Sequence, residues 1–360
     1  MLRRTVLLIL GALPVCAQLT PELTARIDRL VSAQMAKDSI PGLSVAVAVN
    51  GELRWQQGYG FQDLENFVPA TAQTVYRLGS ISKPVTAVAA MQLWEQGKLD
   101  LHSPVQRYVP SFPAKPEGTV TTGLLLAHLG GIRHYGNNAE LDTVTHYNDV
   151  GEALGIFSND PLVAEPGTKY SYSTYGYNLA GAAVQAAAGE RFHDYVRRRI
   201  SEPAGLTTLR DDNRWEIVAH RTRFYSKREN GTVFNSGLTD TSNKIPGGGM
   251  IASAGDMARF ALAVRGGVLV KPATLEAMWS PQRLKGGGVS SYGYGWVIQE
   301  RGGQKVVGHS GGQQGCSTML LMNTATGTVV VVMANMDQVG AAPLASAILD
   351  VVEGRAVEGR

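Results

Sequence analysis

The sequence has few cysteines and no residue spacing typical of a metal site. Its 360 residues include two cysteines, Cys16 and Cys316. Because Cys16 lies in an N-terminal segment that we expect to be removed, no intrachain disulfide is predicted. Cys316 lies in a small-residue, strand-like run, which predicts a buried and unreactive thiol. A zinc site needs about three protein ligands, and no two of the seven histidines form His-x-x-x-His. We therefore expect no metal and no cofactor.

Long runs of like charge and long apolar runs are also absent. Charged residues make up 18% of the chain, and the net charge of +3 is spread along it. No basic stretch is interleaved with aromatic residues, which argues against nucleic acid as a partner. Beyond the N-terminus, no segment approaches the ~20 apolar residues that a membrane span needs. The composition is that of an ordinary globular protein.

The first seventeen residues have the pattern of an export signal. Arg3 and Arg4 form a basic start, residues 5–13 form a short apolar core, and Val15 and Ala17 supply small residues before a cleavage point. This order is typical of a signal peptide over 1–17, cleaved after Ala17. We expect a protein exported to the periplasm or the extracellular space.

Predicted strands lie near both ends of the chain, with predicted helices between them. The Asn50-Gly51 pair between two apolar runs predicts a β-hairpin. Apolar runs predict strands over 43–49, from 53 to about 60, and over 294–299, 305–309, 316–322 and 328–333. Helical periodicity and capping residues predict helices over 21–35, 80–96, 123–129, 149–157, 176–188, 192–200, 254–265, 274–279 and 342–352.

This order predicts an α+β fold. An antiparallel sheet built from both ends of the chain and flanked by helices would hold an inserted helical domain. We assign residues 18–114 and 241–360 to the sheet domain and residues 115–240 to an inserted, all-helical domain. Together they would form one catalytic unit.

A Ser-x-x-Lys tetrad, Ser80 to Lys83, begins the second predicted helix. Residues three apart share one face of a helix, so the two side chains can touch. A serine hydroxyl is a poor nucleophile until a base takes its proton. A lysine can be that base if burial or a neighbouring charge lowers its pKa. Four common residues are weak support by themselves, so the tetrad needs partners elsewhere in the chain.

Two other stretches supply candidate partners. The loop over 166–177 precedes a predicted helix and contains four tyrosines, Tyr170, Tyr172, Tyr175 and Tyr177. A phenol close to a lysine can handle protons, but the residues alone leave the choice among the four open. The stretch from Gly308 to Gly312 begins as a strand and ends in glycines, which let a substrate carbonyl approach backbone N–H groups.

Taken together, these motifs resemble those of the penicillin-binding-protein and class C β-lactamase group of serine hydrolases. That group carries Ser-x-x-Lys at a helix start, Tyr-x-Asn in its helical domain, and Lys/His-x-Gly on a sheet strand. The resemblance covers nearly the whole mature chain and is nearest to the mitochondrial-type serine β-lactamase-like proteins. Further matching stretches are 124–135, 248–253, 256–260 and 294–296.

The resemblance implies roles for the site residues. Pro166-Gly167 and Gly176-Tyr177 fix the register, so that Tyr172 takes the catalytic tyrosine position. Ser80 would be the acylated nucleophile, with Lys83 and Tyr172 sharing the proton transfers. The backbone N–H groups of Ser80 and Gly312 would hold the oxyanion. The residues implied to line the substrate are Thr174, His309, Ser310 and Gly311.

Two departures from the group bear on the substrate. Thr174 stands where the lactamases have asparagine, and His309 stands where many members have lysine. Threonine offers one hydroxyl in place of an amide, and histidine is mostly neutral at pH 7. Both changes argue against a dedicated penicillin hydrolase. We expect an enzyme that cleaves an amide or peptide in a small-molecule or peptide substrate. The alternatives are a carboxylesterase, a β-lactamase, or a non-catalytic binding or assembly protein.

Overall fold

The computed structural model describes residues 18–357, and the predicted signal peptide lies outside this range. Strands from both ends of the chain form one seven-stranded sheet in which each pairing is antiparallel. In spatial order these strands are β11 (Val297–Arg301), β12 (Gln304–Gln313), β13 (Cys316–Asn323), β14 (Val329–Ala334), β1 (Gly42–Val49), β2 (Glu52–Asp63) and β3 (Val68–Pro69). The predicted hairpin joins β1 and β2, and both Asn50 and Gly51 have the positive φ that a tight turn of this kind requires.

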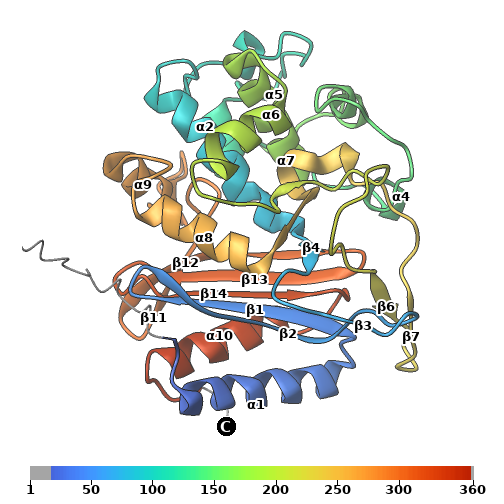
Figure 1. Ribbon diagram of the computed structural model, residues 1–360. Helices are drawn as coiled ribbons and strands as arrows, with labels where there is room; N and C mark the ends of the chain where they lie inside the picture. The colour runs from blue at the N-terminus through green and yellow to red at the C-terminus, as the bar shows by residue number, and fades with distance from the viewer. Residues whose placement is uncertain (1–17, 358–360) are drawn as a thin grey trace, which may run out of the picture.

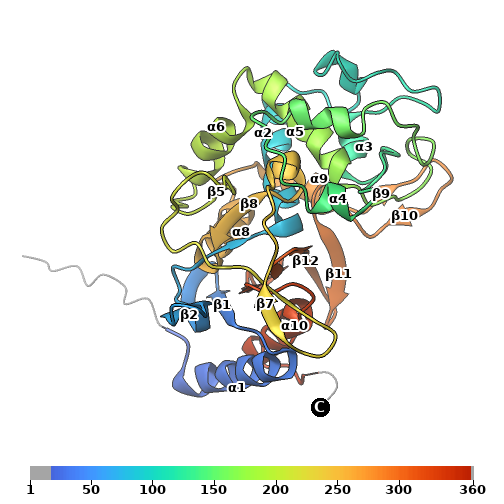
Figure 2. The same cartoon turned by 90° about the vertical axis from the view of Figure 1, so that its right-hand side faces the viewer.

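Helices cover both faces of the sheet (Figure 1). Helices α1 (Pro21–Asp38) and α10 (Ala341–Val352) pack together on one face, and α8 (Ala254–Arg265) packs on β1 and β14 from the other. Because both faces are covered, the central strands β1 and β14 are almost entirely buried, which explains their continuous apolar sequences. Figure 2 shows the same layers from the side, with α1 and α10 at one end of the molecule.

The remaining helices lie mainly on the α8 side of the sheet. They are α2 (Ser82–Glu95), α3 (Thr122–Leu126), α4 (Asn138–Leu141), α5 (Thr174–Ala188), α6 (Phe192–Val196), α7 (Ile245–Gly248) and α9 (Pro272–Met278). Helix α2 contacts α5, α6 and α7 and is buried on nearly every side. One apolar core joins the sheet to these helices, since Leu320 of β13 and Leu179 of α5 belong to the same cluster. The helical region therefore shares its core with the sheet.

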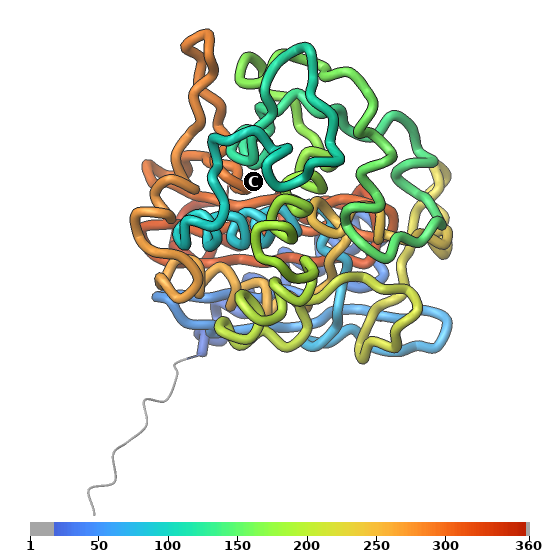
Figure 3. The backbone as a smooth tube through the Cα atoms, turned by 90° about the horizontal axis from the view of Figure 1, so that it is seen from above, coloured from blue at the N-terminus to red at the C-terminus, as the bar shows by residue number. Residues whose placement is uncertain are grey.

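The short strands lie outside the main sheet. They are β4 (Val75–Arg77), β5 (Arg210–Asp211) and β8 (Met250–Ser253) in one small sheet, β6 (Tyr225–Lys227) with β7 (Val233–Asn235), and β9 (Gln282–Arg283) with β10 (Val289–Ser290). The β9–β10 hairpin projects from the rim of the molecule, as the orange loop in Figure 3 shows.

Several sequence-based boundaries require correction. The region 115–240 is not all helical, because β5, β6 and β7 lie within it and β5 pairs with β8 outside it. The expected helix over 149–157 is a 3₁₀ segment, Glu152–Ile156, and the expected helix over 192–200 ends as a π turn after Val196. Ser80 lies in a 3₁₀ turn, Gly79–Ile81, that leads into α2. Pairing between distant segments decides these details, and a local pattern does not contain that information.

Candidate active site

Ser80 lies where the 3₁₀ turn before α2 meets strand β12. Gly79 has a φ of +53°, and a Cβ on it would lie 2.8 Å from the backbone nitrogen of Gly312. Two chain segments more than 200 residues apart are thus in backbone contact beside the serine. Only glycine at position 79 permits both the left-handed conformation and this approach. Ser80 itself is half-buried, so its hydroxyl is accessible.

Two side chains form hydrogen bonds with the hydroxyl of Ser80. Lys83 Nζ lies 3.0 Å from Ser80 Oγ, and the Tyr172 hydroxyl lies 2.7 Å from it. The structure therefore brings together the nucleophile candidate and both candidates for proton transfer, from two elements about ninety residues apart in sequence. Tyr172 is the one tyrosine of its loop with this bond, since Tyr175 bonds Glu140, Tyr177 bonds the carbonyl of Leu126, and Tyr170 is 39% exposed.

Lys83 is completely buried, and no carboxylate of residues 18–357 lies within ion-pair distance of it. Its ammonium nitrogen contacts Ser80, the Thr174 hydroxyl at 3.1 Å and the Gly247 carbonyl oxygen at 2.6 Å. A Cβ on Gly247 would lie 2.6 Å from Thr174, so the glycine lets α7 approach α5 closely at this point. Burial, followed by the positive charge of Lys244, lowers the pKa of Lys83 well below its ordinary value. The neutral amine, which can accept a proton, is therefore favoured.

Tyr172 is held by a group of aromatic rings. The His128 ring lies 4.3 Å from it between centroids, and the His134 ring lies 5.5 Å away on its edge. Burial raises the pKa of Tyr172 above its ordinary value, although the hydrogen bond to Ser80 opposes this. A lysine-stabilised phenolate is thus not favoured in the resting site. The arrangement favours a neutral phenol beside a neutral lysine.

Strand β12 provides the other wall of the site. Ser310 and Gly312 are exposed, and a Cβ on Gly312 would meet no atom within 4 Å, so the backbone there faces open space. Gly311 is buried, and a Cβ on it would lie 2.0 Å from the Leu78 carbonyl oxygen. These glycines allow the strand to lie directly against the segment that carries Ser80.

The His309 side chain is 3% exposed and is directed into the protein. Its Nε2 atom lies 2.9 Å from the Tyr292 hydroxyl, and burial lowers its pKa to about 3. The imidazole is neutral and is not available to a substrate carboxylate in this arrangement. Thr174 is also buried, and its hydroxyl contacts Lys83. Of the side chains expected to line the substrate, Ser310 is thus the accessible one.

Sequence reasoning missed several supporting residues. His128 Nδ1 accepts the backbone N–H of Ser173 at 3.1 Å, and His134 Nδ1 accepts that of Thr174 at 3.2 Å. Both histidines thereby fix the loop that carries Tyr172. His134 lies inside a stretch that matched the family pattern, which was the available signal. Tyr292 and Lys244 lie just before the matching stretches 294–296 and 248–253, but nothing in those stretches indicates that they approach His309 and Lys83.

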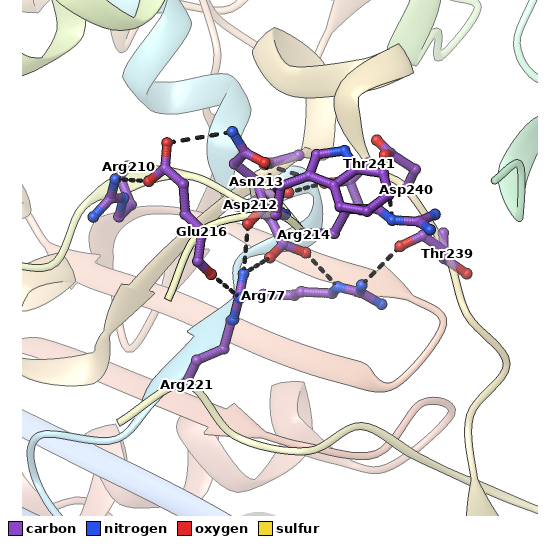
Figure 4. Close-up of polar contacts among 12 residues, drawn as sticks. Arg77, Arg210, Asp212, Asn213, Arg214, Glu216, Arg221, Thr239, Asp240 and Thr241 are labelled. Atoms are coloured by element: carbon purple, nitrogen blue, oxygen red, sulfur yellow. Dashed lines mark hydrogen bonds and ion pairs between the residues drawn. The ribbon is translucent and has the colours of Figure 1, made fainter. Parts of the chain in front are cut away.

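A buried ion-pair network anchors the strand that leads to Ser80. Arg77 of β4 donates to Asp212 Oδ2 at 2.8 Å and to the carbonyl of Thr239 at 3.2 Å, and Arg221 bonds the second oxygen of Asp212 (Figure 4). Asp212 also lines a cavity of about 600 Å³, together with Arg210, Glu216 and Met250. Ser80 does not line this cavity, which is separate from the candidate active site.

Neither a metal site nor a membrane-spanning helix is found among the described residues. Across residues 18–357, no group of histidine, cysteine, aspartate and glutamate side chains could hold a metal ion. Within the same range, no helix is both long enough and apolar enough to span a membrane. Cys316 is buried, and burial raises the pKa of its thiol to about 12, as expected of an unreactive cysteine.

Comparison with known proteins places the chain in a family. The sequence profile of the Beta-lactamase family matches residues 27–353. The human mitochondrial serine beta-lactamase-like protein LACTB is 31% identical over an alignment 412 positions long, which covers 84% of this chain and 75% of that protein. Penicillin-binding protein 4* of Bacillus subtilis is 30% identical and covers 77% of this chain and 64% of its own length.

Solved structures agree with this assignment. The octameric penicillin-binding protein homologue from Pyrococcus abyssi superposes with a TM-score of 0.82 at 25% identity, over 93% of this chain and 78% of that one. A D-amino acid amidase from Ochrobactrum anthropi SV3 shares the fold, with a TM-score of 0.81 at 20% identity over 92% of this chain and 99% of that one. The chain therefore belongs to the beta-lactamase family of serine hydrolases, with the β-lactamase/transpeptidase-like fold.

Proposed function

We propose that this serine hydrolase cleaves an amide or peptide bond through an acyl-enzyme formed on Ser80. The observation that carries the proposal is the pair of hydrogen bonds at one hydroxyl, from Lys83 at 3.0 Å and Tyr172 at 2.7 Å. A nucleophile bonded to a base that is itself oriented by further groups is the general arrangement of covalent hydrolases.

Acylation begins when the neutral amine of Lys83 takes the proton of the Ser80 hydroxyl. Ser80 Oγ then forms a bond to the substrate carbonyl carbon, and the electron pair of the C=O bond moves to its oxygen. The C–N bond breaks as the carbonyl re-forms, and the leaving nitrogen receives a proton through Tyr172, which regains one from Lys83. Water then attacks the ester on Ser80 by the same route in reverse and releases the acid.

The backbone N–H groups of Ser80 and Gly312 are the proposed oxyanion donors. The contact between Gly79 and the Gly312 nitrogen supports this, because it holds the two backbones side by side next to Ser80. Losing one such donor typically costs 3–4 kcal/mol in the transition state, by order of magnitude about 10²–10³ in rate.

Three features support an amide or peptide over a β-lactam as substrate. Thr174 contacts Lys83 instead of offering an amide to the substrate, and the neutral His309 imidazole bonds Tyr292 instead of a carboxylate. Proteins that share the fold include a D-stereospecific amidohydrolase from Streptomyces and the D-amino acid amidase.

We further propose that residues 1–17 are an export signal. The mass of the mature protein recovered from the secreting cell tests this proposal directly.

An active-site serine probe tests the function. We expect a fluorophosphonate to add once to the purified protein, on Ser80 by peptide mass, and we expect no adduct on Ser80→Ala. A folded wild-type protein that takes no adduct would favour the non-catalytic binding or assembly alternative and would refute the proposal.

A substrate panel then ranks the reaction classes. D- and L-amino acid peptides and amides, a short-chain nitrophenyl ester and a chromogenic cephalosporin are compared by kcat/KM. We expect the amides or peptides to lead after correction for their lower intrinsic reactivity. Turnover confined to the ester would assign a carboxylesterase, and turnover dominated by the cephalosporin would assign a β-lactamase.

A further inference from the structure

Lys244 is a second buried lysine close to the catalytic centre. Its side chain is 1% exposed, and its ammonium group donates to the backbone carbonyl of Leu141. No carboxylate among the described residues lies within ion-pair distance of it. Burying a cation without such a partner costs several kcal/mol, to order of magnitude. Because Lys244 is buried at this energetic cost close to Lys83, which contacts Ser80, it needs a functional explanation.

Two structural links connect Lys244 to Lys83. Lys244 directly precedes α7, whose Gly247 carbonyl accepts a hydrogen bond from Lys83. Its ammonium nitrogen also lies 5.5 Å from the centroid of the Tyr135 ring. The Tyr135 hydroxyl bonds Thr174, whose own hydroxyl contacts Lys83. The space between the two lysines is therefore filled by protein, and a charge there is poorly screened.

We propose that Lys244 is a positioning residue for the reaction, whose fixed positive charge keeps Lys83 in the neutral form that can deprotonate Ser80. This inference rests on the proposed role of Lys83 as base. Direct contact between Lys244 and substrate is excluded by its burial, so the residue acts through Lys83.

The charged surroundings of Lys244 allow it to remain an ammonium. The titratable groups near it are Arg77, Lys83, His134, Asp142, Asp212 and Cys316. Arg77 repels it, but Asp212 compensates Arg77 at 2.8 Å, and Asp142 favours the charged lysine. Burial and then Arg77 lower the pKa of Lys244 to about 8, and burial and then Lys244 lower the pKa of Lys83 well below its ordinary value. At neutral pH the cation of the pair is thus Lys244, and the neutral amine is Lys83.

The test follows the rate of fluorophosphonate labelling of Ser80 against pH, which needs no known substrate. Lys244→Gln keeps a donor for the Leu141 carbonyl and removes the charge, whereas Lys244→Arg keeps the charge. We expect the acid limb of the Lys244→Gln profile to move to higher pH, with about a tenfold loss of rate on that limb and recovery at the alkaline plateau. We expect the Lys244→Arg acid limb to coincide with that of wild type.

Lys115→Met is the matched control. Lys115 is a partly buried lysine that donates to the carbonyls of Ser158 and Asp160, at 2.6 and 2.7 Å, far from Ser80 in sequence. We expect this variant to label with the wild-type pH profile, whatever its stability. Loss of a structural lysine is thereby separated from loss of a charge.

If folded Lys244→Gln has the same acid limb as wild type, the inference about Lys244 is wrong. Labelling of the wild type on Ser80 would in that case still support the proposed function. Absence of wild-type labelling refutes both. Should Lys244→Gln not fold, ¹⁵N spectroscopy of lysine Nζ groups in the wild type decides, with Lys83→Met for assignment. A Lys244 ammonium beside a Lys83 amine at neutral pH supports the inference, and a neutral Lys244 overturns it.

Discussion

Two groups of buried cations differ in how their charges are compensated. Arg77 lies against Asp212, which also pairs with Arg221, so each guanidinium has a carboxylate oxygen within 3.2 Å. Lys83 and Lys244 are equally buried, but backbone carbonyls and hydroxyls are their partners. Both groups therefore satisfy their hydrogen bonds, and one of them leaves its charge uncompensated.

The difference separates anchoring from chemistry. A compensated guanidinium stays charged and holds three segments together, since Arg77 reaches Asp212, Thr239 and Gln314. Burial without a counter-ion drives Lys83 toward its neutral form, which is the form that can act as a base. We propose that the site takes its rigidity from the arginine network and its reactivity from the two lysines.

The largest effect is expected from Lys83→Met, which removes the proposed base. Activity should fall up to about 10⁴-fold, because the base at Ser80 is lost. Stability should be unchanged or higher, because an apolar side chain replaces a buried amine that has no counter-ion among the described residues. Labelling kinetics and thermal unfolding measure the two. A strongly destabilised variant would contradict the comparison.

The next effect is expected from Tyr172→Phe, which removes the second hydrogen bond to Ser80. Turnover should fall about 10²- to 10³-fold with little change in thermal stability, because one hydroxyl and not the ring is lost. Tyr170→Phe is the control, since Tyr170 lies in the same loop and is 39% exposed. If Tyr170→Phe loses the activity and Tyr172→Phe keeps it, the tyrosine assignment is wrong.

The opposite signature is expected from Asp212→Asn, which leaves Arg77 buried without its counter-ion. The free energy of unfolding should fall by about 3–5 kcal/mol, as for other broken buried pairs. Denaturant titration measures it. Asp350→Asn is the matched control, because Asp350 is buried between Arg301 and Arg355 on the other face of the sheet. Similar losses in both variants would show that the Arg77 network acts as an anchor.

The smallest effect concerns the pH dependence of stability. Burial lowers the pKa of His309 from 6.5 to about 3. Between these values the unfolded chain binds a proton that the folded chain does not, so stability is complete above the upper value and falls toward the lower one. His309→Gln should flatten the decline of the melting temperature on acidification. The exposed His102→Gln should not, and equal slopes in all three proteins would contradict the assignment.

Much of the fold could be predicted from local pattern. Capping at Thr20 and Ser253, the Asn50-Gly51 turn and the apolar runs located most helices and strands to within a few residues. A single sheet built from strands at both ends of the chain was predicted, whereas the pairing of β1 with β14 within it was not. The strands inside 115–240 were not, because β5 is two residues long and exists through its pairing with β8.

The candidate site, like the fold, could be predicted from the sequence only in part. The sequence by itself predicted the contact between Ser80 and Lys83, since residues three apart on one helical turn have neighbouring side chains. It also determined the family, through motifs in a fixed order. Among the four tyrosines of residues 166–177, Tyr172 was selected only through the family resemblance. His309 was expected to face the substrate.

Tertiary structure alone decided the rest. Burial turned His309 toward Tyr292 and left Lys83 without a counter-charge, and neither can be read from neighbouring residues. The contact of Gly79 with Gly312 and the approach of Lys244 to Lys83 join segments more than 150 residues apart. The amino-acid sequence thus determines which residue types the site contains. Their protonation states depend on the dielectric and on the charges that folding brings around the side chains.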